Sequence, residues 1–189
     1  MSQKHALILI ADGTEEIEAM TPGDILRRCG IEVTYAGLGT TSPTGAQGLP
    51  LRADKTIDDV AGTVADMLVI PGGTEGARSL GESPAVAELI RGHADAGKWV
   101  AAICAAPALV LAKNGFADGR RVTGYPGTEG MFPESASYTG DAVVIHGKFI
   151  TSKGPGTAMR FGLTLGELLA GESVAESVAG DLLLAEAAL

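Results

Sequence analysis

The stretch from Lys98 to Pro107 limits the folds open to this chain more than any other part of it. It begins as a near-continuous apolar run, which is typical of a strand buried on both faces of a parallel sheet. The run stops at Cys104, and Pro107 lies where proline suits the start of a helix, here Ala108–Lys113 ended by Asn114-Gly115. The pattern therefore predicts that Cys104 occupies the sharp turn between a central strand and a helix.

Two interpretations of Cys104 remain open on this stretch alone. On such a turn the side chain projects from the sheet edge and the helix dipole favours the thiolate, so we expect a thiol pKa below its ordinary value of about 8.5. A buried cysteine that acts as a small hydrophobic residue would give the same local pattern. The rest of the chain has to decide between a nucleophile and a packing residue.

Length and charge restrict the class of protein. The 189 residues predict a single domain, 1–189, with one sizeable core. The net charge of −9 argues against nucleic acid and anionic membranes as partners, and no apolar run approaches a membrane span. The start of the chain shows no signal-peptide pattern, and two cysteines, Cys29 and Cys104, cannot form a disulfide framework. We therefore expect a reducing, cytoplasmic location.

Short apolar runs alternate with helical segments along the chain. Besides the run before Cys104, three segments resemble buried strands: Ala6–Ala11, Ile31–Ala36 and Asp66–Ile70. Thr21 followed by Pro22 predicts a helix start, with a helix Asp24–Cys29 after a separate kinked segment. The later elements expected are a short strand near Leu51–Ala53, a brief helix Thr56–Val60, a helix from Ser83 to about Asp95, a strand near Arg121–Thr123, a hairpin of Ala142–Ile145 with Lys148–Ser152, a helix from Gly154 to about Leu169 and a terminal helix Ser173–Leu189 that packs on the body or on a partner subunit.

This alternation predicts an α/β fold with a doubly wound, mostly parallel sheet between helices. Ligands of such sheets bind beyond the carboxyl ends of the strands. Glu18, Gly72-Gly73 and Cys104 each follow the end of a different predicted strand. Their convergence at one edge favours the nucleophile interpretation of Cys104.

The residues that converge with Cys104 suit a catalytic site. The backbone amides of Gly73 and Ala105 could donate hydrogen bonds to an oxyanion. A carboxyl that faces a thiolate stays protonated, so Glu18 could hydrogen-bond the thiolate or act as a general acid and base. Each feature also has a plainer interpretation, a tight turn for the glycines and a solvated surface residue for Glu18.

Other candidate residues point to no metal and no cofactor. His5 precedes a strand, His93 lies on a helix expected at the surface, and His146 is a hairpin-turn residue, without metal-ligand spacing among them. Cys29 is expected to be a packing residue. Gly37-Leu38-Gly39 lacks the rest of a dinucleotide fingerprint.

Several motifs together resemble one known family. The segment Ala101–Pro107 is similar to the nucleophile turn of the ThiJ/PfpI superfamily, in its DJ-one/YajL-like branch. Asp12–Glu18, Asp24–Ile31, Pro71–Gly73 and Thr151–Thr157 resemble the same branch in order and spacing, so the resemblance covers essentially the whole chain. It implies a flavodoxin-like fold, a homodimer, and Cys104 as an easily oxidised nucleophile with Glu18 as its protonated partner.

The resemblance also assigns roles to further residues. Gly73 and Ala105 match the oxyanion amides of the family. The positions that match its substrate pocket are Glu15, Arg28, Tyr125 and Pro155, the last presented by the neighbouring subunit.

Two departures from the family pattern affect the chemistry. Tyr125 stands where many relatives have histidine, and a neutral tyrosine is a poor base near pH 7, so catalysis would depend on Glu18. Ala105 stands where peptidases of the superfamily have histidine, and no His-x-Glu pair follows Cys104. Peptidase and glutamine amidotransferase activities are therefore disfavoured.

Two functions fit this resemblance. The first is a glutathione-independent glyoxalase or protein deglycase, in which Cys104 attacks a small 2-oxoaldehyde such as methylglyoxal, or acts on glycated thiols and amines, without a cofactor. The second is a non-enzymatic sensor of oxidative stress or a redox-regulated chaperone that is switched by oxidation of Cys104. One site would serve both, so the sequence leaves this choice open.

Overall fold

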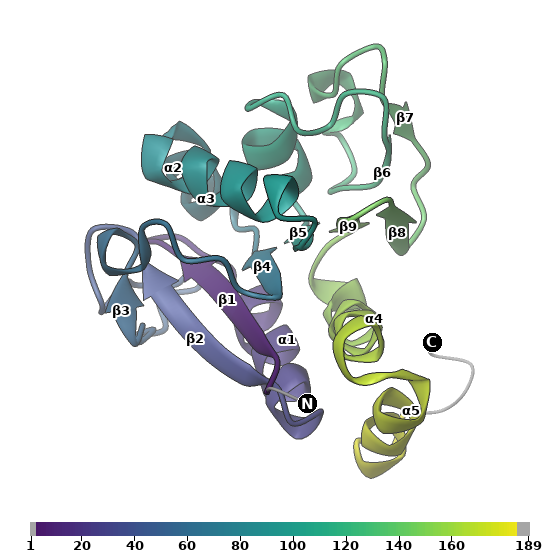
Figure 1. The fold of residues 1–189 in the computed structure, drawn as a ribbon. Coiled ribbons are helices and arrows are strands. Elements are labelled where there is room, and N and C mark those ends of the chain that lie inside the picture. The colour runs from purple at the N-terminus through teal and green to yellow at the C-terminus, as the bar shows by residue number, and fades with distance from the viewer. Residues whose placement is uncertain (1–2, 185–189) are drawn as a thin grey trace.

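A computed structural model describes residues 3–184 of the protein. Its main sheet is built from β1 (His5–Ile10), β2 (Glu32–Gly37), β3 (Lys55–Thr56), β4 (Met67–Ile70), β5 (Trp99–Ile103), β8 (Val143–His146) and β9 (Phe149–Ser152). The strands lie in the order β3-β2-β1-β4-β5-β9-β8, and β8 pairs antiparallel with β9 while the other pairs are parallel (Figure 1). The predicted doubly wound, mostly parallel sheet is confirmed.

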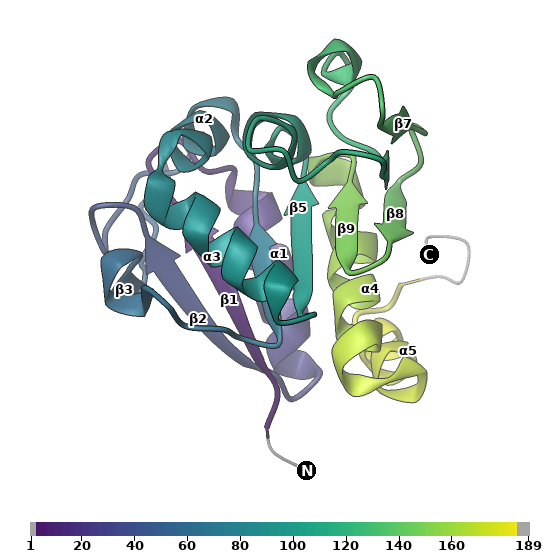
Figure 2. The ribbon, with the colours of Figure 1, turned by 45° about the horizontal axis from the view of Figure 1, so that its top comes forward.

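Helices cover both faces of this sheet. On one face α1 (Glu16–Arg28) packs against α4 (Ala158–Ala170), and α5 (Glu172–Asp181) lies beside α4. The other face carries α2 (Thr74–Glu82), α3 (Pro84–Asp95) and a π-helix, Pro107–Ala112. Figure 2 shows α3 in front of the strands and α1 behind them. A small parallel pair, β6 (Arg121–Val122) and β7 (Ser137–Tyr138), stands next to β8.

The core lies on both faces of the central strands. Every residue of β4, and every residue of β1 after His5, is fully buried. This explains why these strands are continuous apolar runs without alternation. The register pairs Ile8 with Val69 and Ile70 with Ala102, so the carboxyl ends of β1, β4 and β5 meet at one edge.

The predicted helix start at Thr21 is wrong. α1 is one helix that begins at Glu16 and continues through Pro22. An internal proline removes one backbone hydrogen bond and disfavours a helix locally. Here Pro22 is buried, and its Cα lies 3.1 Å from where a Cβ on Gly162 of α4 would be. Close packing between α1 and α4 therefore outweighs the local preference of the proline.

His93 is a second correction, because it is fully buried instead of lying at the surface. Its Nε2 accepts a hydrogen bond from the Ala65 amide at 3.0 Å, and its Nδ1 lies 2.7 Å from the Leu89 carbonyl oxygen, to which it donates. The neutral ring thus ties α3 to the loop before β4. Burial lowers the pKa of His93. The sequence showed the helix but not the loop that covers it.

The structure differs from the sequence prediction at three other places. It contains α2, which was not predicted. The strand expected near Leu51–Ala53 is absent, and an isolated bridge joins Thr44 to Pro50 instead. The terminal helix ends at Asp181, and the predicted part over residues 185–189 lies outside the described residues. Val178 is buried against the core, so this helix packs on the body.

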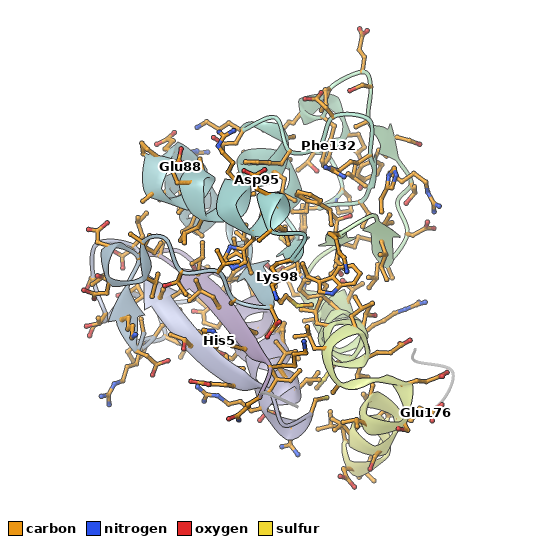
Figure 3. All side chains as sticks on the ribbon, viewed as in Figure 1. His5, Glu88, Asp95, Lys98, Phe132 and Glu176 are labelled. Atoms are coloured by element: carbon orange, nitrogen blue, oxygen red, sulfur yellow. The ribbon has the colours of Figure 1, made fainter. Side chains whose placement is uncertain are left out.

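The amino edge of the sheet is organised around Asp66, which precedes β4. Its Oδ2 accepts the His5 amide at 3.1 Å, and its Oδ1 accepts the Lys98 ammonium at 2.9 Å. His5 and Lys98 are labelled in Figure 3, far from Phe132, which lies beyond the opposite edge. Lys4 reaches the same carboxylate at 3.4 Å.

Candidate active site

Cys104 occupies the turn between β5 and the π-helix in a strained conformation. Its φ is +66°, a region that costs a residue with a side chain about 1–2 kcal/mol. Two hydrogen bonds hold it there: its amide donates to the Ser152 carbonyl at 2.9 Å, and its carbonyl accepts the Tyr125 amide at 2.7 Å. Only 7% of Cys104 is exposed. The fold therefore enforces this unusual backbone.

Glu18 lies fully buried in the first turn of α1 and faces the Cys104 thiol. Its Oε2 accepts a hydrogen bond from the Gly72 amide at 2.9 Å. Glu15, the N-cap of α1, accepts the Glu18 amide at 2.9 Å and donates its own amide to the Gly72 carbonyl at 3.0 Å. The start of α1 is thus fastened to the end of β4, which aims Glu18 at the thiol.

The two glycines after β4 make this approach sterically feasible. A Cβ on Gly72 would lie 2.5 Å from Glu18 Oε2 and 2.6 Å from Cys104 Cβ, which no side chain can satisfy without movement. Gly73 has φ +82° and begins the turn into α2, so its amide lies beside the thiol and lowers the thiol pKa as a hydrogen-bond donor. The amide of Ala105 acts in the same direction.

Burial raises the pKa of Glu18 to about 7. The hydrogen bond with Cys104 opposes this shift, the charge of Glu15 adds to it, and the Gly72 amide again opposes it. Near neutral pH, Glu18 therefore exchanges between its acid and its base form. The raised pKa agrees in direction with the protonated carboxyl expected from the sequence.

The expected lowering of the Cys104 pKa is wrong. The pKa of Cys104 is raised to about 12: burial is the largest cause, the Glu18 charge and hydrogen bond act in the same direction, and the amides of Gly73 and Ala105 only partly compensate. The argument from the helix dipole omitted both burial and the facing carboxylate. Glu18 and Cys104 thus form a coupled pair that loses one proton easily and holds the second, because two adjacent anions repel each other.

A cavity of about 520 Å³ opens above this pair. Six predicted residues line it: Glu15, Gly73, Cys104, Ala105, Tyr125 and Pro155. The cavity therefore brings together a thiol, two backbone amides beside it and, beneath its floor, a buried carboxyl. These are the groups that a nucleophilic mechanism with an oxyanion would need.

Comparisons with known proteins identify the family of this chain. Residues 4–168 match the DJ-1/PfpI family. This chain belongs to the DJ-1/PfpI family. It is 42% identical to Protein dj-1beta of Drosophila melanogaster over 96% of this chain and 98% of that protein. The crystal structure of Drosophila DJ-1beta superposes with a TM-score of 0.94, at 41% identity, covering 97% of this chain and all of that one.

A further relative in the DJ-1/PfpI family has a name that states a reaction. The Glutathione-independent glyoxalase DJR-1.2 of Caenorhabditis elegans is 38% identical over 98% of this chain and 99% of that protein.

Of the pocket residues expected from the DJ-1/PfpI resemblance, Arg28 lies away from the cavity and Pro155 lines it. Arg28 is near the end of α1, at the amino edge of the sheet, where it pairs with Asp24 at 2.7 Å. This chain therefore does not bring Arg28 to the cavity. Pro155 lines the cavity of its own chain, three residues beyond the end of β9. That a neighbouring subunit also presents its Pro155 to this cavity stays a prediction.

The cavity also has a wall that sequence reasoning missed. The missed lining residues are Ala46, Gln47, Thr74, Arg78, Leu109, Thr128 and Met131. A helix after Gly72-Gly73 would have placed Thr74 and Arg78 on one face, four residues apart, but α2 was not predicted. The loop residues carry no such signal, because they reach the cavity only through the folded chain.

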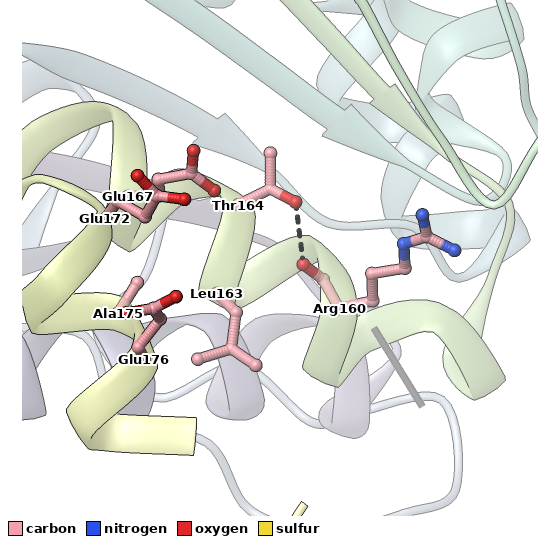
Figure 4. Close-up of a pocket in the computed structure, with 7 residues that line it drawn as sticks. All are labelled: Arg160, Leu163, Thr164, Glu167, Glu172, Ala175 and Glu176. Carbon is pink, nitrogen blue, oxygen red and sulfur yellow. Dashed lines mark hydrogen bonds between the residues drawn. The ribbon is translucent and has the colours of Figure 1, made fainter. Parts of the chain in front are cut away.

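A second hollow of about 280 Å³ lies between α4 and α5 (Figure 4). Glu167, Glu172 and Glu176 line it together with Arg160, whose carbonyl accepts the Thr164 hydroxyl at 2.9 Å. Between residues 3 and 184 no cluster of three or more His, Cys, Asp or Glu side chains suits a metal ion, and none of the described helices is long and apolar enough to cross a membrane.

Proposed function

We propose that this protein is a glutathione-independent glyoxalase that converts 2-oxoaldehydes to 2-hydroxy acids through Cys104. The buried Glu18–Cys104 pair at the floor of the cavity carries the proposal, with the amides of Gly73 and Ala105 beside it. The relative named as a glutathione-independent glyoxalase supports the class of reaction. Adducts of 2-oxoaldehydes with thiols and amines carry the same two carbons, so the proposal extends to deglycation.

The first step forms a bond between the Cys104 sulfur and the aldehyde carbon. Glu18 takes the thiol proton as the sulfur attacks, and the carbonyl electron pair moves to the oxygen. The amides of Gly73 and Ala105 stabilise that oxygen while its charge develops. Glu18 then returns the proton to the oxygen, which leaves a neutral hemithioacetal and an ionised Glu18. A pKa of about 7 suits both transfers.

The second step moves a proton between the two carbons of the substrate. Ionised Glu18 removes the proton from C1, and the electron pair moves onto the C2 carbonyl oxygen to give an enediolate. The hydroxyl proton on the C1 oxygen passes to the C2 oxygen, and Glu18 returns its proton to C2, which leaves a thioester at C1 and a hydroxyl at C2. C1 is oxidised and C2 is reduced within one molecule, so no external oxidant is needed. Water hydrolyses the resulting thioester, which restores the thiol and releases the 2-hydroxy acid, lactate in the case of methylglyoxal.

Lactate formation from methylglyoxal by purified variants tests this proposal. We expect turnover by the wild type, none by Cys104→Ser, and a loss on the order of 10²-fold or more for Glu18→Gln, which keeps the shape but moves no proton. Cys29→Ser is the control, since Cys29 is buried against Gly166 and burial raises its pKa. Full turnover by Glu18→Gln would contradict the mechanism.

The same assay separates the enzyme from an oxidative-stress sensor. The sensor is favoured by one observation, the oxyanion donors beside Cys104, which would stabilise a cysteine sulfinate as well as a substrate oxyanion. A wild type without turnover above Cys104→Ser, but with a sulfinate mass at Cys104 after peroxide, would support the sensor.

The predicted homodimer and cytoplasmic location stay predictions. Ile17 and Met20 on α1, with Met159 on α4, expose apolar side chains on neighbouring helices. We propose that a second copy covers this surface.

A further inference from the structure

Arg78 is the cationic side chain that lines the cavity with Cys104. It lies on α2, which begins directly after Gly73, the residue whose amide faces the thiol. Thr74 and Arg78 are four residues apart and both line the cavity, so they occupy one face of α2. Their separation along the helix axis is about 6 Å. One wall of the cavity therefore leads from the nucleophile to a guanidinium.

The guanidinium of Arg78 is only loosely engaged. Its Nη1 contacts both carboxylate oxygens of Glu75, at 2.9 and 3.1 Å, and 51% of its side chain is exposed. Exposed ion pairs of this kind contribute about 0–1 kcal/mol. Among the described residues, Nε and Nη2 of Arg78 have no hydrogen-bond partner. These two nitrogens can donate to a carboxylate or phosphate in the paired geometry that arginine favours.

The cavity is larger than methylglyoxal requires. Methylglyoxal has five heavy atoms, whereas a volume of about 520 Å³ falls in the range of pockets that hold much larger ligands, roughly 300–1,000 Å³. A substrate bound covalently to Cys104 would leave the space toward Arg78 unfilled unless it carried a further group. The Glu15 carboxylate also lines the cavity, but it is already bound to the Glu18 amide as the N-cap of α1.

We propose that Arg78 selects 2-oxoaldehydes that carry a terminal anionic group, a carboxylate or a phosphate, a few atoms beyond the carbonyls. The inference rests on the proposed function and names its substrate class. Cys104 holds the aldehyde carbon as before, and Arg78 binds the anion at the far end. Covalent chemistry is unchanged, because the anionic group takes no part in it.

Turnover of a charged and a neutral substrate tests this selection. The probes are 4,5-dioxopentanoate, a 2-oxoaldehyde with a terminal carboxylate, and its methyl ester. We expect the wild type to prefer the acid, and Arg78→Gln to reduce the ratio of kcat/KM for acid over ester on the order of 10-fold, mainly through KM, as loss of a charged hydrogen bond does. Glu75→Gln should raise the ratio, because it removes the competing carboxylate.

Arg91→Gln is the matched control. Arg91 makes the corresponding pair with Glu88 three residues away on α3, outside the cavity, so its loss should leave the ratio unchanged. Equal ratios in the wild type and Arg78→Gln would overturn the inference, while methylglyoxal turnover would still support the glyoxalase.

A binding measurement keeps the two proposals separable. Levulinate has the carboxylate and a ketone but no aldehyde, so it should slow iodoacetamide labelling of Cys104 in the wild type and much less in Arg78→Gln. Equal protection of both proteins would refute a role for Arg78 even if no substrate were turned over.

Discussion

The two edges of the sheet hold carboxylates in opposite settings. At the carboxyl edge, Glu18 is fully buried beside a thiol, and burial raises its pKa to about 7. At the amino edge, burial also raises the pKa of Asp66, but Lys98, the His5 amide and Lys4 outweigh it, so the pKa ends below its ordinary value. Ionised Glu18 at the carboxyl edge therefore lowers the free energy of unfolding, whereas ionised Asp66 at the amino edge raises it.

Backbone strain shows the same contrast. Gly97, in the turn before β5, has φ +65°, and Cys104, directly after β5, has φ +66°. Glycine adopts this conformation at no steric cost, whereas cysteine does not. The strand is thus preceded by a residue that suits this backbone and followed by one that does not. Such strain is common at functional sites.

The largest effect is expected from Gly72→Ala, which would disrupt the contact between Glu18 and Cys104 at the carboxyl edge. Its Cβ would meet Glu18 Oε2 and the Cys104 Cβ at 2.5 and 2.6 Å, so the pair would be forced apart. We expect a loss of about 3 kcal/mol in the free energy of unfolding, near the upper end for overpacking, and loss of turnover. Urea unfolding and the lactate assay measure both.

Gly130→Ala provides the control for Gly72→Ala. Gly130 has open space around it, and its φ is not positive, so alanine should leave stability and turnover nearly unchanged. Equal stability of the two alanine variants would show that the close approach at Gly72 is not a constraint.

The sequence was enough for the sheet and for the meeting of Glu18, Gly73 and Cys104, because strand ends of a parallel sheet share one edge. It was not enough for α1, where packing against Gly162 carries the helix through Pro22. The sign of the Cys104 pKa shift also depends on burial and on the distance to Glu18, which only the folded chain sets. Local sequence patterns predict helices and strands, whereas contacts between these elements determine stability and pKa values.

Glu18→Gln should gain stability relative to the wild type as the pH rises. The unfolded carboxyl titrates near 4.5 and the folded one near 7, so between these values the folded state binds more protons. Stability supplied by Glu18 is complete below pH 4.5 and is lost as the pH rises to 7. Glutamine does not titrate, so the variant should gain on the order of 2 kcal/mol at pH 8 relative to pH 4.5.

Thermal unfolding of wild type and Glu18→Gln at pH 4.5, 6 and 8 measures this gain. The difference in Tm should grow with pH in favour of the variant. A constant difference across the series would mean that Glu18 titrates alike in both states, which would remove the basis for its role as acid and base near neutral pH.

Asp66→Asn should produce the smallest effect, with the opposite sign. The folded pKa of Asp66 lies below its unfolded value of 3.8, so its contribution to stability is present above pH 3.8 and is lost as the pH falls through the folded value. Asparagine can still accept the His5 amide but attracts neither lysine. With 20% of the Asp66 side chain exposed, its two ion pairs should contribute about 1 kcal/mol together.

Denaturant unfolding of wild type and Asp66→Asn at pH 7 and pH 3 therefore tests the amino edge. We expect the variant to be less stable at pH 7, with a smaller deficit at pH 3, because the stability that ionised Asp66 supplies is lost as the pH falls below 3.8. The deficit at pH 7 should also shrink in 1 M salt, because partly exposed charges are screened. If the loss of stability in Asp66→Asn changed with neither pH nor salt, Asp66 would act through backbone hydrogen bonds alone. The two edges would then differ only in how deeply their carboxylates are buried, and Lys4 and Lys98 would contribute nothing to the difference.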